Sequence, residues 1–467
     1  MKPAVSPRFG GQHGSRSLAL QVLLDCQPGQ PFAQELLDTA FTTHRAPHAA
    51  ADRRMATQLV YGVLRRRGTL DALLQPLVSR PQADVEPWLW DILRLGAFQL
   101  SLLDHVPLHA AMNETVELAA QFGRPQAKGF INGVLRNFLS LLTDEFGDTP
   151  ASNALPVEPG RYRRLTRAVL PDPASQRVQY LAGGFSLPSW LVERWLPRLG
   201  WDECIRLGFW FAGQAPLWLR VNRLKTNRTD FLAALAGAGL KADVGDNPDA
   251  VRLTTPTAIR DLPGYAEGWF SVQDESATNV AAALAPTPGS RVLDLCAAPG
   301  GKTTHLAEQM DNRGEIIACD VDERRLQTVR ELCSRLGIGI VQTVLLQETQ
   351  RGRWEAPPAG PFDFILVDVP CSNTGVLGRR PEARWRLKRV DLVQLETLQV
   401  RLLRCAAERI RPGGTIVYST CSIEPGENGQ LVRRALQDLP ELQLEAEQEQ
   451  MPGAPADGGY WARLRRK

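Results

Sequence analysis

The stretch VLDLCAAPGGKTTHLAE, residues 292–308, decides how the C-terminal part of the chain is expected to fold. Its apolar start predicts a buried strand, Gly300 and Gly301 predict a tight turn, and KTTHLAE predicts the beginning of a helix. A strand, a glycine turn and a helix in this order are typical of a loop that lets a nucleotide-like ligand approach the backbone closely.

Two common nucleotide-binding patterns are excluded at this loop. A Walker loop needs a glycine where Cys296 stands, and the dinucleotide pattern G-x-G-x-x-G is absent. Asp320 ends the next predicted strand, about 20 residues further on, where an acid can accept hydrogen bonds from ribose hydroxyls. A nucleoside cofactor such as S-adenosylmethionine therefore fits best. The alternative is an ordinary tight turn followed by an exposed aspartate.

Strands and helices alternate from residue 286 to the end of the chain. The predicted strands are SRVLDLCA, EIIACDV, IVQTVLL, FDFILVDVP and GTIVYSTCS, with helical patterns between them. This alternation predicts a parallel, doubly wound sheet with helices on both faces. Ligands of such sheets bind beyond the carboxyl ends of the strands.

Four of these strand ends carry side chains suited to chemistry, namely Cys296, Asp320, Asp368 and Cys421. We expect them to face one crevice, together with Cys371, which follows Asp368 by way of a proline. Proline, glycine, asparagine and serine surround Cys371 and Cys421, which argues against a core role for these two thiols. A core or lining role is expected for the other cysteines of this region, Cys296, Cys319, Cys333 and Cys405.

A pair of cysteines in such a crevice suits the methylation of cytosine at C5. That carbon is a poor nucleophile until a thiolate adds to C6 of the ring. The scheme needs a cysteine with a lowered pKa, and a helix N-terminus or a cation can lower it. A helix predicted to start within 424–428 and the side chain of Lys302 are the candidates for these two roles.

The rest of the chain divides by pattern into three segments. Residues 1–142 show apolar residues at helical spacing throughout and predict an all-α bundle, in which Arg65–Arg67 close one helix. Residues 143–160 are polar and rich in proline and predict a linker. Residues 161–285 mix helix and strand, including a helix capped by Thr229, and predict a small α+β subdomain. The doubly wound domain then occupies residues 286–467.

Composition sets further bounds. The 467 residues carry a net charge of only +3, so charge alone does not indicate a nucleic-acid binder. No stretch reads as a signal peptide or a membrane span, and we expect a cytoplasmic protein. None of the eight cysteines forms a CxxC pair and the histidines do not cluster with them, so neither a metal site nor a disulfide framework is expected.

The chain resembles the RNA cytosine-C5 methyltransferases of the NOL1/NOP2/sun family. The matching stretches are LCAAPGGKTTH, ACDVD, LVDVPCSNTGVLGRRPEARW, YSTCSIEPGENG and SVQDESA. DRRMATQLVYGVLR, LRLGAFQL and GFINGVLRNFL in the N-terminal part resemble a NusB-like domain. The resemblance implies a multidomain protein: an all-α NusB-like RNA-binding domain, a small α+β RNA-binding subdomain, and a Rossmann-like class I S-adenosylmethionine methyltransferase domain.

The resemblance also implies roles for individual residues. Cys421 would be the nucleophile, and Cys371 would assist release of the product. Asp368 would contact both the cofactor and the base, and Asp320 would hold the cofactor ribose. The remaining cofactor-binding residues would be Cys296, Ala297, Ala298, Pro299, Gly300, Gly301 and Lys302.

Two positions depart from the family pattern. Val369 stands where the family usually has alanine, a change that should be tolerated. The family also usually has an aspartate near the adenine after the third strand, where this chain reads VQTVLLQETQ. Gln347 or Glu348 could take that place, and the adenine contact is not assigned.

The resemblance implies small-subunit ribosomal RNA as the substrate. We also expect a monomer that does not act on DNA. The segment 378–389 carries six Lys or Arg residues around Trp385, which suits single-stranded RNA, or else forms a solvated helix face. Arg220, Asn222, Arg223 and Lys225 are further candidates for RNA contacts. The rival functions are a transfer-RNA methyltransferase of the same family and a noncatalytic RNA-binding assembly factor, although binding alone would need neither cysteine.

Overall fold

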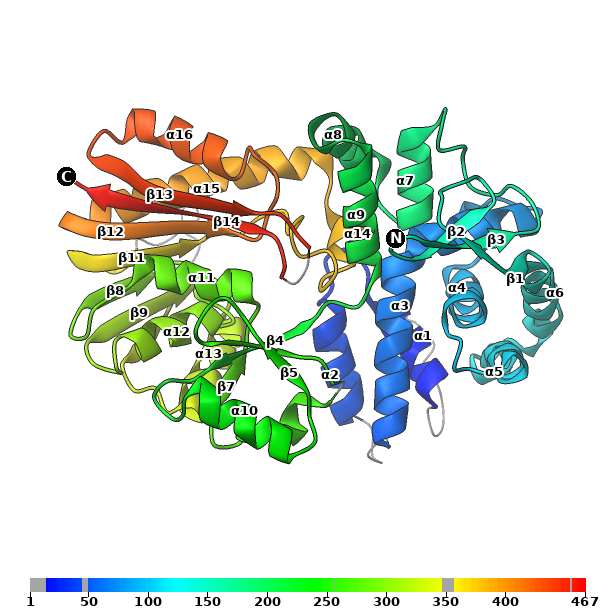
Figure 1. The fold of residues 1–467 in the computed structure, drawn as a ribbon, viewed down its shortest axis with the longest axis horizontal. Coiled ribbons are helices and arrows are strands. Elements are labelled where there is room, and N and C mark those ends of the chain that lie inside the picture. Colours follow the sequence, from blue (N-terminus) through cyan, green and yellow to red (C-terminus); the bar gives the residue numbers. More distant parts are fainter. Residues whose placement is uncertain (1–13, 44–48, 256, 347–356, 454–455) are drawn as a thin grey trace. The chain divides into compact units, whose positions relative to one another are not determined.

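The computed structural model describes residues 14–43, 49–255, 257–346, 357–453 and 456–467 (Figure 1). The chain forms two compact units. The N-terminal unit comprises Met1–Gln214 together with Leu377–Arg386, and the C-terminal unit comprises Ala215–Val376 and Leu387–Lys467. The chain therefore enters the N-terminal unit a second time, through a short segment that lies just after Cys371 in the sequence.

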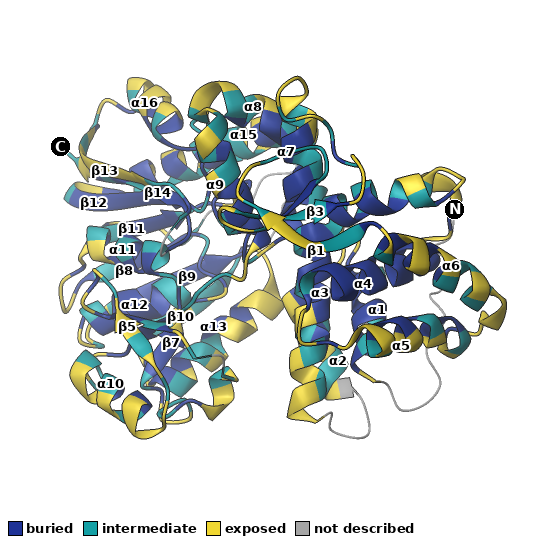
Figure 2. Cartoon of the chain, turned by 45° about the vertical axis from the view of Figure 1, so that its right-hand side comes forward, coloured by how far each residue is buried: buried dark blue, intermediate teal, exposed yellow. Residues whose placement is uncertain are grey.

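The first part of the N-terminal unit is helical, which confirms the all-α prediction. Its helices are α1 (Ser15–Asp25), α2 (Ala33–Thr43), α3 (Ala50–Leu74), α4 (Pro87–Leu102), α5 (Leu108–Gln121) and α6 (Lys128–Leu139). α4 begins with Pro87, at a position where a backbone N–H would have no intrahelical partner. Every residue of α4 from Leu89 to Ser101 is buried, so this helix forms the centre of the bundle (Figure 2).

The three consecutive arginines lie within α3 rather than at its end, because the helix continues to Leu74. Arg65 Nε donates a hydrogen bond to the carbonyl oxygen of Gly378 at 2.9 Å, and Arg66 donates to that of Pro156 at 2.8 Å. Burial lowers the pKa of each of these two arginines to about 10. The prediction that Arg65–Arg67 close the helix is therefore wrong, and Arg65 and Arg66 serve packing inside the unit.

The segment predicted as a linker, 143–160, instead forms part of a sheet. Its strands are β1 (Leu142–Gly147), β2 (Ala154–Glu158) and β3 (Arg161–Leu165), which are antiparallel in the order β1-β3-β2. Ala154 and Leu155 are fully buried. The prolines and polar residues that suggested a linker lie mostly in turns and on the exposed face of this small sheet.

Residues 161–285 do not form one subdomain, because the boundary between the units falls after Gln214. Three helices before it belong to the N-terminal unit: α7 (Arg177–Phe185), α8 (Ser189–Leu199) and α9 (Trp201–Ala212). The elements after it belong to the C-terminal unit: β4 (Leu217–Val221), α10 (Arg228–Gly237), β5 (Ala242–Val244), β6 (Ala250–Leu253) and β7 (Phe270–Val272). The four strands form an antiparallel sheet in the order β5-β6-β4-β7. The side chain of Asn227, not Thr229, caps α10.

A seven-stranded sheet in the order β10-β9-β8-β11-β12-β14-β13 forms the core of the C-terminal unit. Its strands are β8 (Arg291–Asp294), β9 (Glu315–Asp320), β10 (Val341–Leu345), β11 (Phe362–Asp368), β12 (Ile410–Thr420), β13 (Leu442–Gln450) and β14 (Gly459–Arg466). The first five pair in parallel, as predicted. The hairpin of β13 and β14 adds an antiparallel edge that the sequence analysis did not predict.

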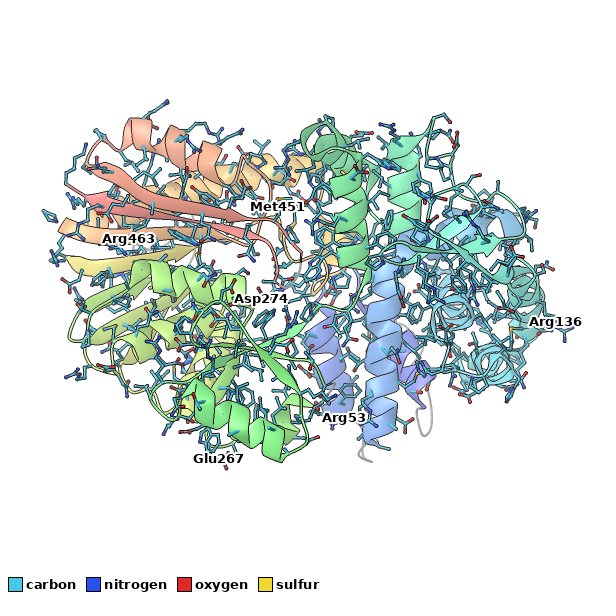
Figure 3. All side chains as sticks on the ribbon, in the orientation of Figure 1. Arg53, Arg136, Glu267, Asp274, Met451 and Arg463 are labelled. Atoms are coloured by element: carbon cyan, nitrogen blue, oxygen red, sulfur yellow. The ribbon has the colours of Figure 1, made fainter. Side chains whose placement is uncertain are left out.

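Helices cover both faces of this sheet, which confirms the doubly wound prediction (Figure 1). One face carries α11 (Glu275–Leu284), α12 (Gly301–Gln309) and α13 (Glu323–Leu336), and the other carries α15 (Arg389–Arg409) and α16 (Gly429–Asp438). Arg463 of β14, labelled in Figure 3, donates to the carbonyl oxygen of Ala283 at 2.8 Å and so ties the hairpin to α11. No helix in the described part of the chain is long and apolar enough to cross a membrane.

Candidate active site

The loop between β8 and α12 is built as a close backbone turn. Gly300 has a φ of 100°, and a Cβ at this position would lie 3.2 Å from the Cα of Val329. A side chain there would strain the turn and crowd α13. The hydroxyl of Thr303 donates to Asp294 Oδ2 at 2.7 Å, which joins the start of α12 to the end of β8.

A cavity of about 210 Å³ opens against this loop. Most of the predicted cofactor residues line it: Cys296, Ala297, Ala298, Pro299, Gly301, Lys302 and Asp368. The rest of the wall comes from Val272, Gln273, Asp274, Ala277 and Asp294. Gly300 and Asp320 are not among the lining residues.

Asp294 is a feature of this cavity that sequence reasoning missed. Its Oδ1 atom is buried and has no hydrogen-bond partner among the described residues. Burial raises the pKa of this carboxyl to about 7. A ligand with a donor or a positive charge in the cavity would satisfy the unpaired oxygen. The sequence signal was the acid at the end of β8, two residues before Cys296.

Asp320 is buried and supports the cofactor loop. Its Oδ2 atom accepts a hydrogen bond from the backbone N–H of Ala298 at 3.1 Å, and Oδ1 accepts one from Val321 at 2.8 Å. The carboxylate therefore stabilises the loop between β8 and α12 without lining the cavity. Its predicted contact with a cofactor ribose stays a prediction.

Lys302 and Asp368 form a pair at the cavity wall. Lys302 Nζ lies 2.7 Å from Asp368 Oδ2, and the hydroxyl of Ser419 donates to Asp368 Oδ1 at 2.7 Å. Burial opposes the charge of Lys302, but the adjacent carboxylate outweighs it and raises the pKa of this amine. The β11–β12 register, which places Asp368 opposite Ser419, fixes this arrangement.

The two predicted catalytic cysteines lie together. Cys371 Sγ and Cys421 Sγ are 3.1 Å apart, and Cys421 Sγ lies 3.3 Å from Asn373 Oδ1. The hydrogen bond to Cys421, followed by burial, raises the pKa of Cys371 well above its ordinary value. Neither cysteine is fully buried.

The helix predicted to start within 424–428 is present as α16. Asn428 is its N-cap and Gly429 its first residue, and residues 425–428 form a turn before it. The influence of this helix N-terminus on Cys421 stays a prediction. Lys302, the other predicted source of positive potential, lines a hollow together with Cys421.

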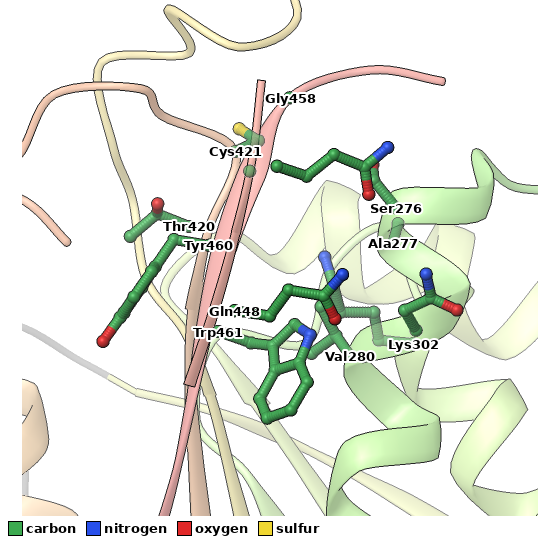
Figure 4. Close-up of a pocket in the computed structure, with 13 residues that line it drawn as sticks. Ser276, Ala277, Val280, Lys302, Thr420, Cys421, Gln448, Gly458, Tyr460 and Trp461 are labelled. Atoms are coloured by element: carbon green, nitrogen blue, oxygen red, sulfur yellow. The ribbon is translucent and has the colours of Figure 1, made fainter. Parts of the chain in front are cut away.

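A second hollow borders Cys421 (Figure 4). Lys302 and Thr420 line it together with residues of α11 and of the β13–β14 hairpin, which include Ser276, Gln448 and Trp461. Hydroxyl, amide and aromatic groups therefore lie beside the thiol. The hairpin that supplies half of this wall was absent from the sequence prediction.

The remaining cysteines of the C-terminal unit take core or lining positions, as predicted. Cys319 and Cys333 are buried, and burial raises their pKa values to about 12 and about 11. Burial also raises the pKa of Cys405, and it raises that of Cys296 well above the ordinary value. None of these thiols is suited to act as a thiolate.

Two of the predicted RNA contacts are wrong because the side chains are buried. Arg220 has no exposed surface and pairs with Glu308 at 2.6 Å, while it also donates to the carbonyl oxygen of Gly301 at 2.6 Å. Asn222 is equally buried and donates to the carbonyl oxygens of Gly268 and Leu336. An alternating sequence pattern assigns residues to the two faces of a strand, but it does not show which face packs against the rest of the protein. Arg223 and Lys225 are exposed, and their role stays a prediction.

The basic segment around Trp385 is divided between the two units, since residues 378–386 belong to the N-terminal unit and residues 387–389 to the C-terminal unit. Arg380, Lys388 and Arg389 are exposed, and an RNA contact stays a prediction for them. Arg384 has no exposed surface and donates to the carbonyl oxygens of Ser186, Phe211 and Leu377 at 3.1, 3.0 and 2.9 Å. The half-buried ring of Trp385 lies under Arg67. For Arg384, both an RNA contact and a solvated helix face are therefore wrong.

The candidates for the adenine contact, Gln347 and Glu348, lie outside the described residues.

Family models match three parts of the chain. The NusB family matches residues 13–140, a ferredoxin-like domain of RsmF/B-like methyltransferases matches 187–260, and the 16S rRNA methyltransferase RsmB/F model matches 281–457. The Rossmann-like sheet, the glycine turn and the cavity at its carboxyl edge agree with the last of these. Fold, site and family model together define a class I methyltransferase whose cofactor is S-adenosylmethionine.

Individual relatives match over nearly the full length. Ribosomal RNA small subunit methyltransferase B of Salmonella typhi is 37% identical, covering 98% of this chain and 99% of that protein. The solved structure of PH0851 aligns with a TM-score of 0.75 and 25% identity, covering 98% of this chain and 100% of the other. NSun6 from Pyrococcus horikoshii with SFG shares the fold, with a TM-score of 0.52 and 21% identity over 59% of this chain and 97% of that one. The chain belongs to the ribosomal RNA small subunit methyltransferase B family.

Proposed function

We propose that this protein methylates C5 of a cytosine in small-subunit ribosomal RNA through a covalent bond between Cys421 and C6 of the base. The observation that carries the proposal is the pair of thiols at 3.1 Å, placed where β11 and β12 end beside a cofactor-sized cavity. Binding alone would need neither thiol, so a noncatalytic assembly factor accounts poorly for this pair.

The cavity fits S-adenosylmethionine in its donor set. The unpaired Oδ1 of Asp294 suits the ammonium group, and the loop 296–302 offers close backbone approach. Asp320 and Asp368 would complete the site. When bound, the cofactor supplies an electrophilic methyl group.

The chain's own residues would carry the remaining steps. Cys421 adds to C6 as a thiolate, which makes C5 nucleophilic enough to take a methyl group. Lys302, close to the thiol, favours its ionised form. A base must then take the C5 proton, and the electrons of that C–H bond restore the C5–C6 double bond as Cys421 departs with the electrons of the S–C6 bond.

Cys371 and Asp368 have different parts in this scheme. A neutral Cys371 thiol beside Cys421 can return a proton to the departing sulfur or position the base that removes the C5 proton. Asp368, held by Lys302 and Ser419, would accept a hydrogen bond from the N4 amino group, which lies beside N3 of the base. The target cytosine would have to be unpaired or flipped out to reach this depth.

RNA rather than DNA is the proposed substrate, because DNA cytosine methyltransferases use the cysteine at the position of Cys371 as their nucleophile. One chain supplies both thiols and the cavity wall, which supports action as a monomer. The substrate places the proposed site of action in the cytoplasm. We also propose that the NusB-like helices bind RNA.

Bisulfite sequencing of RNA from a deletion strain tests the substrate. One cytosine of small-subunit ribosomal RNA should lose its methyl group, and the gene should restore it. Loss of methylation only in transfer RNA would support the rival substrate, and unchanged methylation in both would overturn the proposal.

A further inference from the structure

The buried carboxyl group of Glu427 lies between the two loops that carry the thiols. It accepts a hydrogen bond from the backbone N–H of Ser372 at 2.9 Å and another from the hydroxyl of Ser372. It also accepts one from the hydroxyl of Ser422 at 2.5 Å. Ser372 directly follows Cys371, and Ser422 directly follows Cys421. The carboxyl group of Glu427 therefore binds the residue next to each of the two cysteines.

The surroundings of Glu427 make this bridge rigid. Thr374 Oγ1 lies 3.1 Å from both serine hydroxyls, and Gln399 Nε2 donates to Glu427 at 2.9 Å and to the carbonyl oxygen of Pro370 at 2.9 Å. Tyr418 donates its hydroxyl to the carbonyl oxygen of Glu427 at 2.7 Å. Ser372, Thr374, Ser422 and Glu427 are all buried.

A buried carboxyl group such as that of Glu427 costs free energy of folding, so stability alone does not explain its presence. Burial raises the pKa of Glu427, although the hydrogen bonds from Ser372, Ser422 and Gln399 oppose the shift. A buried carboxyl group is tolerated only when its hydrogen bonds are satisfied, and an apolar side chain would often serve stability as well. Its contacts point to a role in geometry, because they join Ser372 and Ser422, which lie 50 residues apart in the sequence.

We propose that Glu427 is a positioning residue that fixes the separation of Cys371 and Cys421 by binding the serine that follows each of them. The catalytic consequence rests on the proposed function, since two thiols must act in turn on one base. A shift of about 1 Å in a reacting group can lower a rate by about a hundredfold. Glu427 itself does not line either cavity and acts only through the two loops.

Phenylarsine oxide tests the geometry without RNA, because it condenses with two neighbouring thiols. The measurement counts only the arsenical that binds to Cys371 and Cys421. This is the part of the binding that is lost in Cys421→Ala and also in Cys371→Ala. Glu427→Gln keeps the shape but replaces one acceptor oxygen with a donor, so this uptake should slow at least tenfold. Glu408→Gln, at an exposed position on α15, should match the wild type. Uptake at the wild-type rate in folded Glu427→Gln protein would overturn the proposal.

A second set of variants covers the case in which Glu427→Gln does not fold. Ser372→Ala and Ser422→Ala each remove one hydroxyl and leave the backbone donor of Ser372 in place. Combined, they should slow arsenical uptake at least tenfold while calorimetry gives unchanged affinity for S-adenosylmethionine. Unchanged uptake in this double variant would equally overturn the proposal.

Methylation of ribosomal RNA then links the geometry to turnover. Glu427→Gln should lower kcat at least tenfold with KM for RNA unchanged, because the carboxyl group does not touch the substrate. If wild-type protein does not methylate this RNA, the proposed function fails, yet the arsenical result still decides the role of Glu427. Wild-type kcat in the variant would sink the positioning role by itself.

Discussion

The sulfur atoms of Cys371 and Cys421 lie 3.1 Å apart, although 50 residues separate them in the chain. Parallel pairing of β11 with β12 brings this about, since it sets Asp368 beside Ser419 and leaves each cysteine on the loop that follows. The two thiols do not share one environment. The hydrogen bond to Cys421, followed by burial, raises the pKa of Cys371, whereas Cys421 lines the hollow that Lys302 also borders.

This asymmetry predicts different outcomes for the two alanine variants. Cys421→Ala should abolish methyl transfer and leave no covalent RNA complex, because the attacking sulfur is gone. Cys371→Ala should still attack and methylate but release product poorly, so a protein–RNA adduct should accumulate. Denaturing electrophoresis would detect the adduct, and RNase digestion or the double variant should remove it. The reverse pattern would assign attack to Cys371.

Asp320→Ala should weaken binding of S-adenosylmethionine by about 1.5–3 kcal/mol, the scale of hydrogen bonds to a charged group. The loss has two sources, namely the predicted ribose contact and the support that Asp320 gives to the N–H of Ala298. Calorimetry measures the affinity. The matched control is Asp438→Ala, at the exposed C-terminal end of α16, which should bind normally. Unchanged affinity in folded Asp320→Ala protein would remove Asp320 from the cofactor site.

Much of the C-terminal unit could be predicted because local pattern and tertiary structure agree there. The apolar strands, the glycine turn and the helices that follow are all encoded within short windows, and the end of each parallel strand marks the ligand edge. Asp320, Asp368, Cys371 and Cys421 could be found in this way. The edge hairpin of β13 and β14 could not, because its polar strand β13, LQLEAEQEQ, has little of the apolar signal of a buried strand.

Several of the errors concern polar groups whose partners are distant in sequence. Arg220 and Arg384 look like RNA-binding residues because basic side chains are usually exposed, and only the fold reveals the carboxylate and carbonyl groups that enclose them. Glu427 was missed for the same reason. Its hydrogen bonds reach Ser372, and no periodicity records such a pairing.

Arg384→Met should destabilise the N-terminal unit by about 2–4 kcal/mol. The variant leaves the carbonyl groups of Ser186, Phe211 and Leu377 without their donor inside a buried site. Urea denaturation combined with hydrogen exchange in α3 measures the loss. Arg136→Met, on the exposed side of α6 (Figure 3), should cost less than about 0.5 kcal/mol. Equal stability of the two variants would contradict a structural role for Arg384.

The stability of the C-terminal unit should depend on His305 in weak acid. Burial, assisted by the charge of Arg220, lowers the pKa of this imidazole to about 4, against about 6.5 in an unfolded chain. Between these values the unfolded chain binds a proton that the folded chain does not, so stability is lost as the pH falls.

Wild-type protein should lose about 2 kcal/mol from this group between about pH 7 and about pH 5. His305→Gln cannot titrate and should lack this part of the pH dependence. The opposite contribution of Asp294, whose raised pKa favours the fold as pH falls, is common to both proteins and cancels in their difference. Urea unfolding of both proteins at the two pH values gives that difference, and a constant value would show that His305 is not held neutral by the fold.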